Sequence, residues 1–452
     1  MESVAAMTER LQRDRVQYLL AQFVDVHGSP KAKMVPAGAL AAVVESGAGF
    51  AGGALWGMGQ GAHSHDMMGR ADLSSYTPMP WQDGTARFAC DLYVDGQPHP
   101  FCPRVNLQRV LRGAREQGVI FNVGMEPEHF LVVKNPDGSI APWDPAGVDR
   151  LAKPCYDFKS VAPALGYLQE VVGYCNQLGW GAYQADHEDA NGQFEINFHY
   201  ADALTTADRM TFFKMMTGQV AGKYGAIATH MAKPFGNRTG SGAHLHFHVA
   251  DAATGANRFI DLADPRGLGL SRFAYHFLGG VIRHAAAICA VASPTVNCYK
   301  RLAVGRGLFS PRSGYTWTPA FISYGDNNRT QMLRVCEPGH VEDRSPSSAC
   351  NPYLLLAAYL AAGLDGIATG ADPGEPHRVD LYAMTEERTR SLGLRHLPQS
   401  LPEAIAALEE DDVVRGALGA IAPEFIELKR QEWNDYHRDV SRWELEQYLT
   451  LF

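Results

Sequence analysis

DHEDANGQFE, at Asp186–Glu195, is the stretch that decides how this chain is interpreted. Two distant segments belong with it: GMEPEH at Gly124–His129 and GSGAHLHFH at Gly240–His248. Successive side chains of a strand point to opposite faces, so each segment, if extended, directs several ligand-type groups the same way. We therefore expect three strands that converge on one cavity.

The residues expected on a common face follow from this alternation. They are Glu126 with Glu128, Glu195 with Asn197, and His244 with His246 and His248. Between Glu188 and Glu195 the spacing is odd, but Asn191 and Gly192 are typical of a hairpin turn that would return both carboxylates to one place. The alternative for any one of these patterns is the ordinary polar face of a half-buried strand.

Several carboxylates gathered in one cavity would repel one another unless cations lay between them. A site rich in oxygen ligands and poor in nitrogen ligands suits Mg²⁺ or Mn²⁺ better than Zn²⁺. The combination of the three segments therefore predicts a site for divalent cations.

The overall composition narrows the class of protein. The 452 residues carry a formal charge of −9 with no basic run, which argues against nucleic acid or an anionic membrane as partner. The eight cysteines show no CxxC spacing, and reduced thiols in a cytoplasmic protein are expected. The start of the chain lacks a signal-peptide core, and the longest apolar run, Ala285–Ser293, is too short for a membrane span.

The order of elements predicts an α+β protein with an antiparallel sheet, because the ligands sit at period-two spacing on strands that are polar on one face. Five glycines in Phe50–Gly61 indicate a loop that closely approaches another group. We place a domain boundary near residue 104, which gives domains 1–104 and 105–452. The second domain is expected to open with a strand at Val119–Val133 that is interrupted near Pro127. The expected helices are 1–15, Val105–Glu116, Ala164–Leu178, Thr206–Tyr224, Phe277–Val291, Pro352–Leu364 and a pair in Pro423–Leu449.

At this point the chain resembles the glutamine synthetase family over nearly its whole length. The matching blocks are DVHG at Asp25–Gly28, CDLYVDG at Cys90–Gly96, PTVNCYKRL at Pro294–Leu302, NNRT at Asn327–Thr330 and NPYLLLAAYLAAGLDGI at Asn351–Ile367. The resemblance implies a small β-grasp domain followed by a large domain whose curved antiparallel sheet is flanked by helices. It also implies active sites between neighbouring subunits, in a homododecamer of two stacked hexameric rings.

The resemblance also implies roles for individual residues. Glu128, Glu188 and Glu195 fall on ligands of a first metal, and Glu126, His244 and Glu342 on ligands of a second. Arg301 and Arg344 fall on positions that bind the amino-acid carboxylates, and Arg329 and Arg334 on positions that face the transferred phosphate. Gly240 falls where the backbone touches substrate, with Thr239 in place of a usual asparagine, and His246 and His248 fall in the nucleotide-binding stretch.

The reaction implied is activation of a carboxylate by ATP. The γ-phosphoryl group passes to the side-chain carboxylate of L-glutamate, and an amine then displaces phosphate from the acyl phosphate. Two divalent cations and the arginines offset the charge that would otherwise keep the two anions apart.

The amine pocket departs from the ammonia-using members, which have an aspartate where this chain has Ala51. A flap glutamate of the family is replaced by Gly307. Loss of the aspartate makes the pocket larger and less polar, which favours methylamine and resembles the branch of γ-glutamylmethylamide synthetases and type III glutamine synthetases. His63, His65 and Asp66 remain candidates for the missing base or plain loop residues.

The alternatives are glutamine synthesis from ammonia, a γ-glutamyl ligase for longer amines, a phosphotransferase, and a non-catalytic scaffold. All six metal positions are filled by ligating residues, which argues against the scaffold. Trp56 is either an aromatic wall for the amine or a packing anchor. Tyr382 aligns with a tyrosine that some bacterial members modify with AMP.

Overall fold

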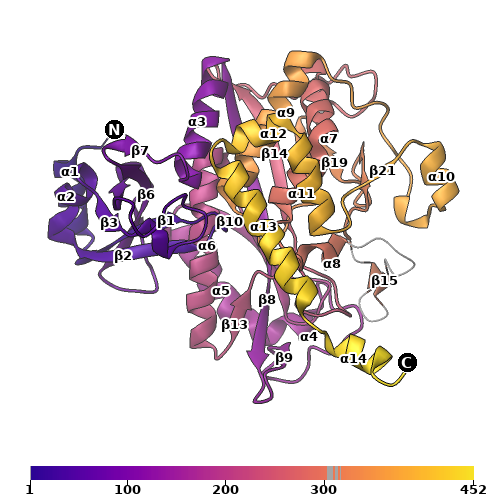
Figure 1. Ribbon diagram of the computed structural model, residues 1–452, viewed down its shortest axis with the longest axis horizontal. Coiled ribbons are helices and arrows are strands. Elements are labelled where there is room, and N and C mark those ends of the chain that lie inside the picture. Colours follow the sequence, from indigo (N-terminus) through magenta and orange to yellow (C-terminus); the bar gives the residue numbers. More distant parts are fainter. Residues whose placement is uncertain (1, 303–308, 311–313, 316) are drawn as a thin grey trace.

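The first 98 residues build a seven-stranded sheet that stands to one side of a larger body (Figure 1). The computed structural model describes residues 2–302, 309–310, 314–315 and 317–452. The strand order is β2-β1-β6-β4-β3, with β5 and β7 also paired to β6, and β1 runs parallel to β6. The elements are α1 (Val4–Arg13), β1 (Tyr18–Val24), β2 (Pro30–Pro36), α2 (Leu40–Glu45), β3 (Ala48–Phe50), β4 (Met67–Ala71), β5 (Thr77–Pro78), β6 (Thr85–Val94) and β7 (Gln97–Pro98).

The larger body is built on a ten-stranded sheet of order β10-β11-β8-β14-β20-β19-β18, with β9, β12 and β13 also paired to β8. Its pairs are antiparallel except β18 with β19, which is parallel. The strands are β8 (Val119–Lys134), β9 (Ile140–Pro142), β10 (Ala182–His187), β11 (Gln193–Phe198), β12 (Ala201–Asp202), β13 (Ile227–Thr229), β14 (Ala243–Asp251), β18 (Tyr324–Gly325), β19 (Leu333–Glu337) and β20 (His340–Asp343).

β8 runs through Pro127 without the interruption that the proline suggested. The pairing with β14 ends at Pro127, and the pairing with β11 begins at Glu128. Proline cannot donate a backbone hydrogen bond, and here it occupies the position where the strand changes partner.

The helices cover the sheet and carry most of the apolar core. They are α3 (Pro103–Glu116), α4 (Phe158–Val161), α5 (Leu165–Gln177), α6 (Ala203–Lys223), α7 (Arg272–Ala292), α8 (Cys298–Leu302), α9 (Pro352–Thr369), α10 (Glu386–Ser391), α11 (Leu401–Glu410), α12 (Asp412–Leu418), α13 (Ile421–Arg438) and α14 (Arg442–Tyr448). Two short pairs, β15 (Phe309–Ser310) with β16 (Gly314–Tyr315) and β17 (Phe321–Ile322) with β21 (Arg395–His396), complete the description. The predicted helices are all present, with ends shifted by a few residues.

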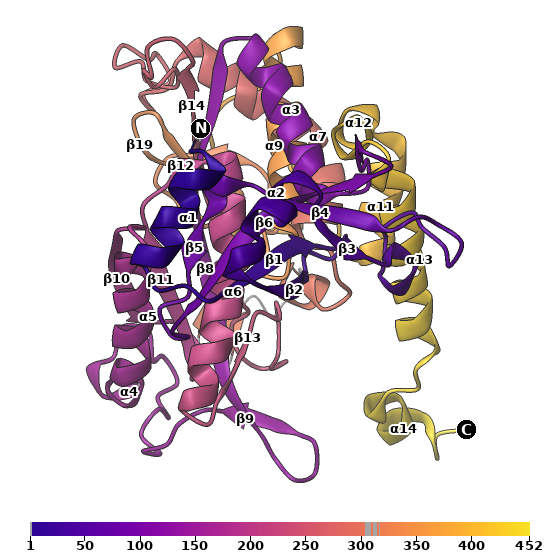
Figure 2. The same ribbon diagram turned by 90° about the vertical axis from the view of Figure 1, so that its left-hand side faces the viewer.

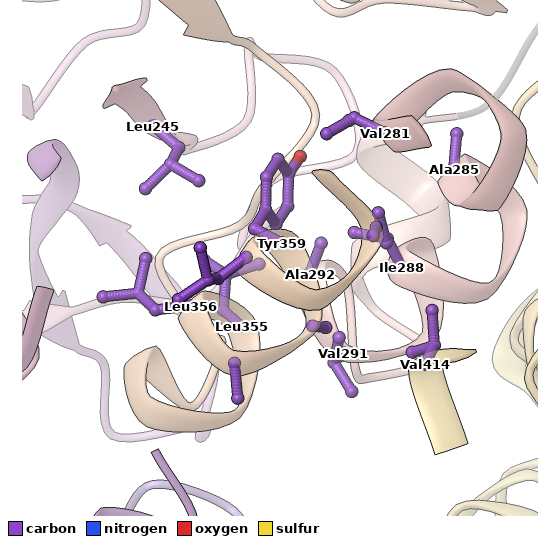
Figure 3. Close-up of a cluster of buried hydrophobic side chains, with 14 of the residues drawn as sticks. Leu245, Val281, Ala285, Ile288, Val291, Ala292, Leu355, Leu356, Tyr359 and Val414 are labelled. Carbon is purple, nitrogen blue, oxygen red and sulfur yellow. The ribbon is translucent and has the colours of Figure 1, made fainter. Parts of the chain in front are cut away.

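α7 and α9 cross at the centre of this core. Figure 3 shows their side chains meeting Leu245 of β14 and Val414 of α12. Gly280 allows the close crossing, because a Cβ there would lie 2.0 Å from the carbonyl oxygen of Ala362. Both helices are long and apolar enough to cross a membrane by length and composition, but 78% and 67% of their apolar windows are buried inside the fold. They are core helices here.

Arg104 joins the two parts of the chain from a buried position just past the first sheet. Its guanidinium donates to Asp91 at 2.7 Å, to Asp72 at 2.7 Å and to Asp208 of α6 at 3.0 Å. Burial disfavours the charge, but Asp208 and Asp91 outweigh it and hold the pKa of Arg104 well above its usual value. The domain boundary near residue 104 stays a prediction.

All eight cysteines are free thiols, and six of them are buried. Their pattern agrees with the expected reduced state. The exceptions, Cys155 and Cys336, are partly exposed and both line the cavity described next.

Candidate active site

A cavity of about 880 Å³ opens on the polar face of the large sheet, a volume ordinary for a small-molecule site. Twelve of the predicted site residues line it: Glu126, Glu128, Glu188, Glu195, Gly240, His244, His246, Arg301, Arg329, Arg334, Glu342 and Arg344. Residues far apart in the sequence thus meet in one place, as the alternation of the three segments predicted.

Strand register explains this convergence. Glu195 of β11 lies opposite Glu128 of β8, and His244 of β14 lies opposite Glu126 of β8. On the far side of β14, His246 lies opposite Glu342 of β20. Residues directly opposite on neighbouring strands have their side chains on the same face, so three cross-strand pairs carry five predicted ligands and His246.

The sixth ligand, Glu188, reaches the cavity through the predicted hairpin. Its backbone N–H donates to Gln193 at 2.9 Å, and Gly192 closes the turn with a φ of +74°. The Asn191 amide donates to Asp149 at 2.8 Å, which anchors the turn from outside. The odd spacing of Glu188 and Glu195 is absorbed by this turn.

The ligating atoms form compact groups. One atom from each member lies within 4.8 Å of the others in Glu128–Glu188–Glu195, in Glu126–Glu195–His244 and in Glu126–His246–Glu342. The first group equals the set predicted for the first metal. The set predicted for the second is also close, since His244 Nδ1 lies 3.3 Å from Glu126 Oε2 and 3.5 Å from Glu342 Oε1. Oxygen donors dominate all three groups, which fits Mg²⁺ or Mn²⁺.

Electrostatics agree with a cation in the first group. Burial, with the neighbouring Glu128 and Asp186, raises the pKa of Glu188 well above its usual value. Burial, with Glu126 and Glu188, does the same to the pKa of Glu195. Carboxyls that resist ionisation side by side are what a divalent cation would relieve.

For Glu126 and Glu342 in the second group, hydrogen bonds and nearby positive charges outweigh the effect of burial on ionisation. Burial opposes ionisation of Glu126, but hydrogen bonds from His244 and His246 outweigh it and hold the pKa of Glu126 well below its usual value. For Glu342, Arg344 and the two histidines overcome burial and lower its pKa to about 2. These two carboxylates are therefore already ionised.

The arginines are held by the backbone and by acidic partners. Arg301 donates to the carbonyls of Arg344 and Ser345, each at 2.9 Å. Arg334 and Arg344 donate to the two oxygens of Glu342, at 2.6 and 2.7 Å. Arg329 also lines the cavity and is exposed to it. Four guanidinium groups thus face one space and can bind carboxylate or phosphate oxygens in pairs.

Gly240 and Gly242 sit where the backbone meets Arg301. A Cβ on Gly240 would lie 2.3 Å from the carbonyl oxygen of Ala232, and one on Gly242 would lie 2.6 Å from Arg301 Nη2. The buried Thr239 hydroxyl donates to Asp189 at 2.7 Å. Glycine is required at Gly240, because the nearest atom that a Cβ would meet there belongs to the backbone.

Two predicted site residues are not part of the cavity lining. His248 lies two residues beyond His246 on the same strand, which places it about 7 Å further along. There it contacts Asn122 at 3.0 Å and the ring of Tyr200. Ala51 is an exposed residue before a short turn of helix at Gly52–Ala54 in the small sheet region.

The other described residues considered for the amine pocket or for modification do not line the cavity either. His65 contacts Asp95 at 2.7 Å on the surface, while Trp56 is 61% exposed. The Tyr382 hydroxyl donates to the carbonyl of Thr318 at 3.0 Å. Gly307 lies outside the described residues.

Asp186 also lines the cavity, although it is not among the predicted site residues. It lies on β10 opposite Glu195, and its Oδ1 is buried without a hydrogen-bond partner among the described residues. Burial and the nearby Glu126 and Glu128 raise its pKa to about 6. The alternation of side chains along a strand could have identified Asp186, because Asp186 and Glu188 are two residues apart and share a face.

Gln193 was also missed. Its amide donates to Glu128 Oε2 at 3.0 Å, to the carbonyl of Gly240 at 3.1 Å and to Ser241 at 3.2 Å. It ties the hairpin to the glycine segment. A glutamine in an acidic stretch carries no signal of this kind.

Comparison with known proteins agrees with this geometry. Residues 15–95 match the model of the glutamine synthetase β-grasp domain, and residues 100–448 match that of the glutamine synthetase catalytic domain. The chain belongs to the glutamine synthetase family, and it is a carboxylate–amine ligase in class.

Individual relatives show which members of the family the chain resembles. A glutamate–methylamine ligase of Methyloversatilis universalis is 46% identical, with 98% of each chain covered, and a glutamine synthetase of Rhizobium leguminosarum bv. phaseoli is 40% identical, with 97% and 98% covered. A solved structure described as a GmaS/ADP complex superposes with a TM-score of 0.91 at 43% identity, covering 99% of this chain and all of the other. The resemblance to the family and to its methylamine branch is confirmed, as is the α+β fold with its β-grasp domain.

Proposed function

We propose that this protein is an ATP-dependent ligase that joins methylamine to the γ-carboxylate of L-glutamate through a γ-glutamyl phosphate intermediate. The observation that carries the proposal is the convergence of six metal-type ligands and four arginines on one cavity, in a chain 46% identical throughout to a glutamate–methylamine ligase. Ammonia as the amine is the second candidate, supported by the glutamine synthetase relatives.

The acidic residues of the cavity and His244 would bind the divalent cations. Glu128, Glu188 and Glu195 would hold one Mg²⁺ or Mn²⁺, and Glu126, His244 and Glu342 a second. Bound there, the cations would neutralise the nucleotide phosphates and the substrate carboxylate so that these anions can approach.

The arginines complete the binding of both substrates. Arg301 and Arg344 bind the carboxylates of L-glutamate beside the backbone of Gly240. Arg329 and Arg334 face the phosphoryl group as it is transferred. A guanidinium keeps its charge throughout, so it stabilises the acyl phosphate as well as the reactants.

Asp186 is suited to accept the proton of the incoming amine. An amine that arrives as a cation must lose a proton before its nitrogen can attack, and a carboxylate within reach serves both to bind the cation and to take that proton. Asp186 has a buried oxygen without a partner among the described residues and lies beside Glu188 and Glu195.

Methylamine rather than ammonia is favoured by Ala51. Its side chain supplies no charge, and replacement of a carboxylate by a methyl group leaves room for the methyl of the amine. Ala51 is exposed and outside the cavity of its own chain. We therefore place it in a neighbouring subunit's site, within a cytoplasmic homododecamer, and His63, His65 and Asp66 would accompany it.

We propose that His246 and His248 contact the bound nucleotide. His246 lines the cavity next to Glu126 and Glu342, where phosphates would lie. His248 stands one step further along β14. It would act at the outer end of the nucleotide.

The test is amine-dependent phosphate release from ATP with L-glutamate, measured for methylamine, ammonia, ethylamine and a diamine. We expect kcat/KM to be highest for methylamine. A higher kcat/KM for ammonia would assign glutamine synthesis instead, and a higher value for the diamine would assign a longer-amine ligase. Glu188→Ala should abolish turnover with every amine.

A further inference from the structure

A second kind of ligand cluster lies on the cavity wall beside the carboxylates. His246 of β14, Cys336 of β19 and His340 of β20 each offer one ligand atom within 4.8 Å of the others. All three line the cavity and are partly exposed. Two imidazoles and a thiol form a donor set that suits Zn²⁺, whereas Mg²⁺ prefers oxygen ligands.

In the chain without a metal, the two imidazoles are hydrogen-bonded to each other through the nitrogens that would bind it. His246 Nδ1 and His340 Nε2 face each other at 2.8 Å. Behind them, His246 Nε2 lies 3.1 Å from Glu126 Oε1 and His340 Nδ1 lies 3.2 Å from Glu337 Oε1. Histidines that bind metals commonly have a carboxylate at the other ring nitrogen, which fixes tautomer and orientation.

The backbone delivers the thiol to this pair. β19 and β20 pair through Val335 with Val341 and Glu337 with His340, and the register shifts between those pairs. The extra residue of this bulge is Cys336. A bulge re-aims the side chain it carries, and here that side chain joins His246 and His340.

We propose that His246 Nδ1, His340 Nε2 and Cys336 Sγ form a binding site for a thiophilic divalent ion, Zn²⁺ above all, distinct from the two sites of hard cations. The thiol would lose its proton to solvent as the metal binds. Tetrahedral Zn²⁺ separates two nitrogen ligands by about 3.3 Å, so the imidazoles need to open by only about half an ångström. The three protein ligands leave a fourth position for water or another small ligand.

His246 gives this site a consequence for the proposed function. The same ring presents Nε2 to Glu126 and Glu342, where the nucleotide phosphates are proposed to lie. Zinc on Nδ1 would occupy that wall and weaken nucleotide binding, so ATP and Zn²⁺ should compete. This consequence rests on the proposed function, but the metal site itself does not.

The experiment uses Co²⁺ as a spectroscopic substitute for Zn²⁺, with the full chain and excess Mg²⁺ to fill the hard-cation sites. We expect a thiolate-to-cobalt charge-transfer band that saturates at one Co²⁺ per chain and is abolished by one equivalent of Zn²⁺. Cys336→Ser should remove the band, and His340→Gln should weaken Co²⁺ binding by about 10-fold or more.

Cys155→Ser is the matched control, because Cys155 is also partly exposed and lines the same cavity without belonging to the histidine cluster. Its band should equal that of the wild type. The proposal is overturned if the wild type shows no band, if the band survives Cys336→Ser, or if Cys155→Ser removes it. Should Cys336→Ser fail to give the wild-type circular dichroism, His340→Gln decides alone, and unchanged Co²⁺ affinity in that variant overturns the site.

Discussion

Asp186 is the proposed acceptor of a proton from the amine, and its replacement tests this role. Asp186→Asn keeps the size of the side chain but removes the basic oxygen. We expect kcat/KM for methylamine to fall by about 100-fold or more, as is usual when a general base is lost. The KM for ATP should change little, because the residue serves the amine. Steady-state kinetics with each substrate varied in turn measures both.

Asp189→Asn is the control for that variant. Asp189 also lines the cavity and its pKa is likewise raised by burial to about 6, but its carboxylate accepts from Thr239. We expect a smaller fall in kcat/KM for the amine than in Asp186→Asn. Equal losses in the two variants would remove the special role of Asp186.

Glu188 links the metal site to stability. In the metal-free chain its pKa is raised above the unfolded value by burial and by Glu128 and Asp186, so its contribution favours folding at low pH and is lost as pH rises through the folded pKa. Mg²⁺ should therefore raise the melting temperature more at pH 8 than at pH 6. In chelator at pH 8, Glu188→Gln should be more stable than the wild type by about 1 to 2 kcal/mol.

Thermal unfolding with and without Mg²⁺ measures this effect. Glu188→Gln should also lose most of the increment given by Mg²⁺. Glu170→Gln, which removes a carboxylate paired with Lys223 outside the cavity, should keep that increment. A Mg²⁺ increment independent of pH in the wild type would contradict the placement of the cation.

Much of the site followed from alternation along strands. The period of two put Glu126 with Glu128 and His244 with His246, and the register of β8, β11 and β14 brought them together. Cys336 could not be predicted, because its direction depends on a bulge that no sequence pattern marks. His248 shares a face with His246 yet lies beyond the cavity, since a shared face says nothing of distance along the strand.

The close crossing of α7 and α9 depends on Gly280, which has no side chain. A Cβ at Gly280 would lie 2.0 Å from the carbonyl of Ala362 and 2.8 Å from Gly366 Cα, and these backbone atoms cannot move separately from α9. Gly280→Ala should therefore destabilise the fold by about 1 to 3 kcal/mol despite the better helix propensity of alanine. Thermal or denaturant unfolding measures the loss.

Gly218→Ala in α6 is the matched control. A Cβ there meets nothing within 4 Å, so only the helix propensity changes. We expect a gain of about 0.5 to 1 kcal/mol. If both variants lost stability alike, close packing at Gly280 would not be the cause.

The ends of these elements were harder to predict than their existence. α7 begins at Arg272, five residues before the apolar run that indicated it, because Ser271 caps the helix by accepting from Ala274. Arg272 and His276 interrupt the apolar pattern at this end of the helix, so the continuous apolar run begins only at Phe277. The strand at Pro127 was predicted to be interrupted because a proline was read without knowledge of where β8 changes partner.

At the scale of the whole molecule, two exposed features bear on the proposed assembly. α14 and the C-terminus project from the body in both views, and Trp443, Leu449 and Phe452 are exposed there (Figures 1 and 2). Ala51 likewise does not line the cavity that holds the predicted ligands of its own chain. Both observations support an assembly in which neighbours cover these surfaces.

Mixed assemblies test whether Ala51 serves a neighbour's site. Glu188→Ala leaves the loop intact but removes a metal ligand, whereas Ala51→Trp leaves the ligands intact but fills the amine pocket. Each variant alone should be nearly inactive with methylamine. When the two are co-expressed in equal amounts, a site built from an intact cavity and an intact neighbouring loop should arise by chance in about a quarter of cases, because the two halves come from different subunits. Amine-dependent phosphate release should then recover to that fraction of the wild type. If the loop acted on the cavity of its own chain, no combination would join two intact halves, and the mixed assemblies would stay inactive.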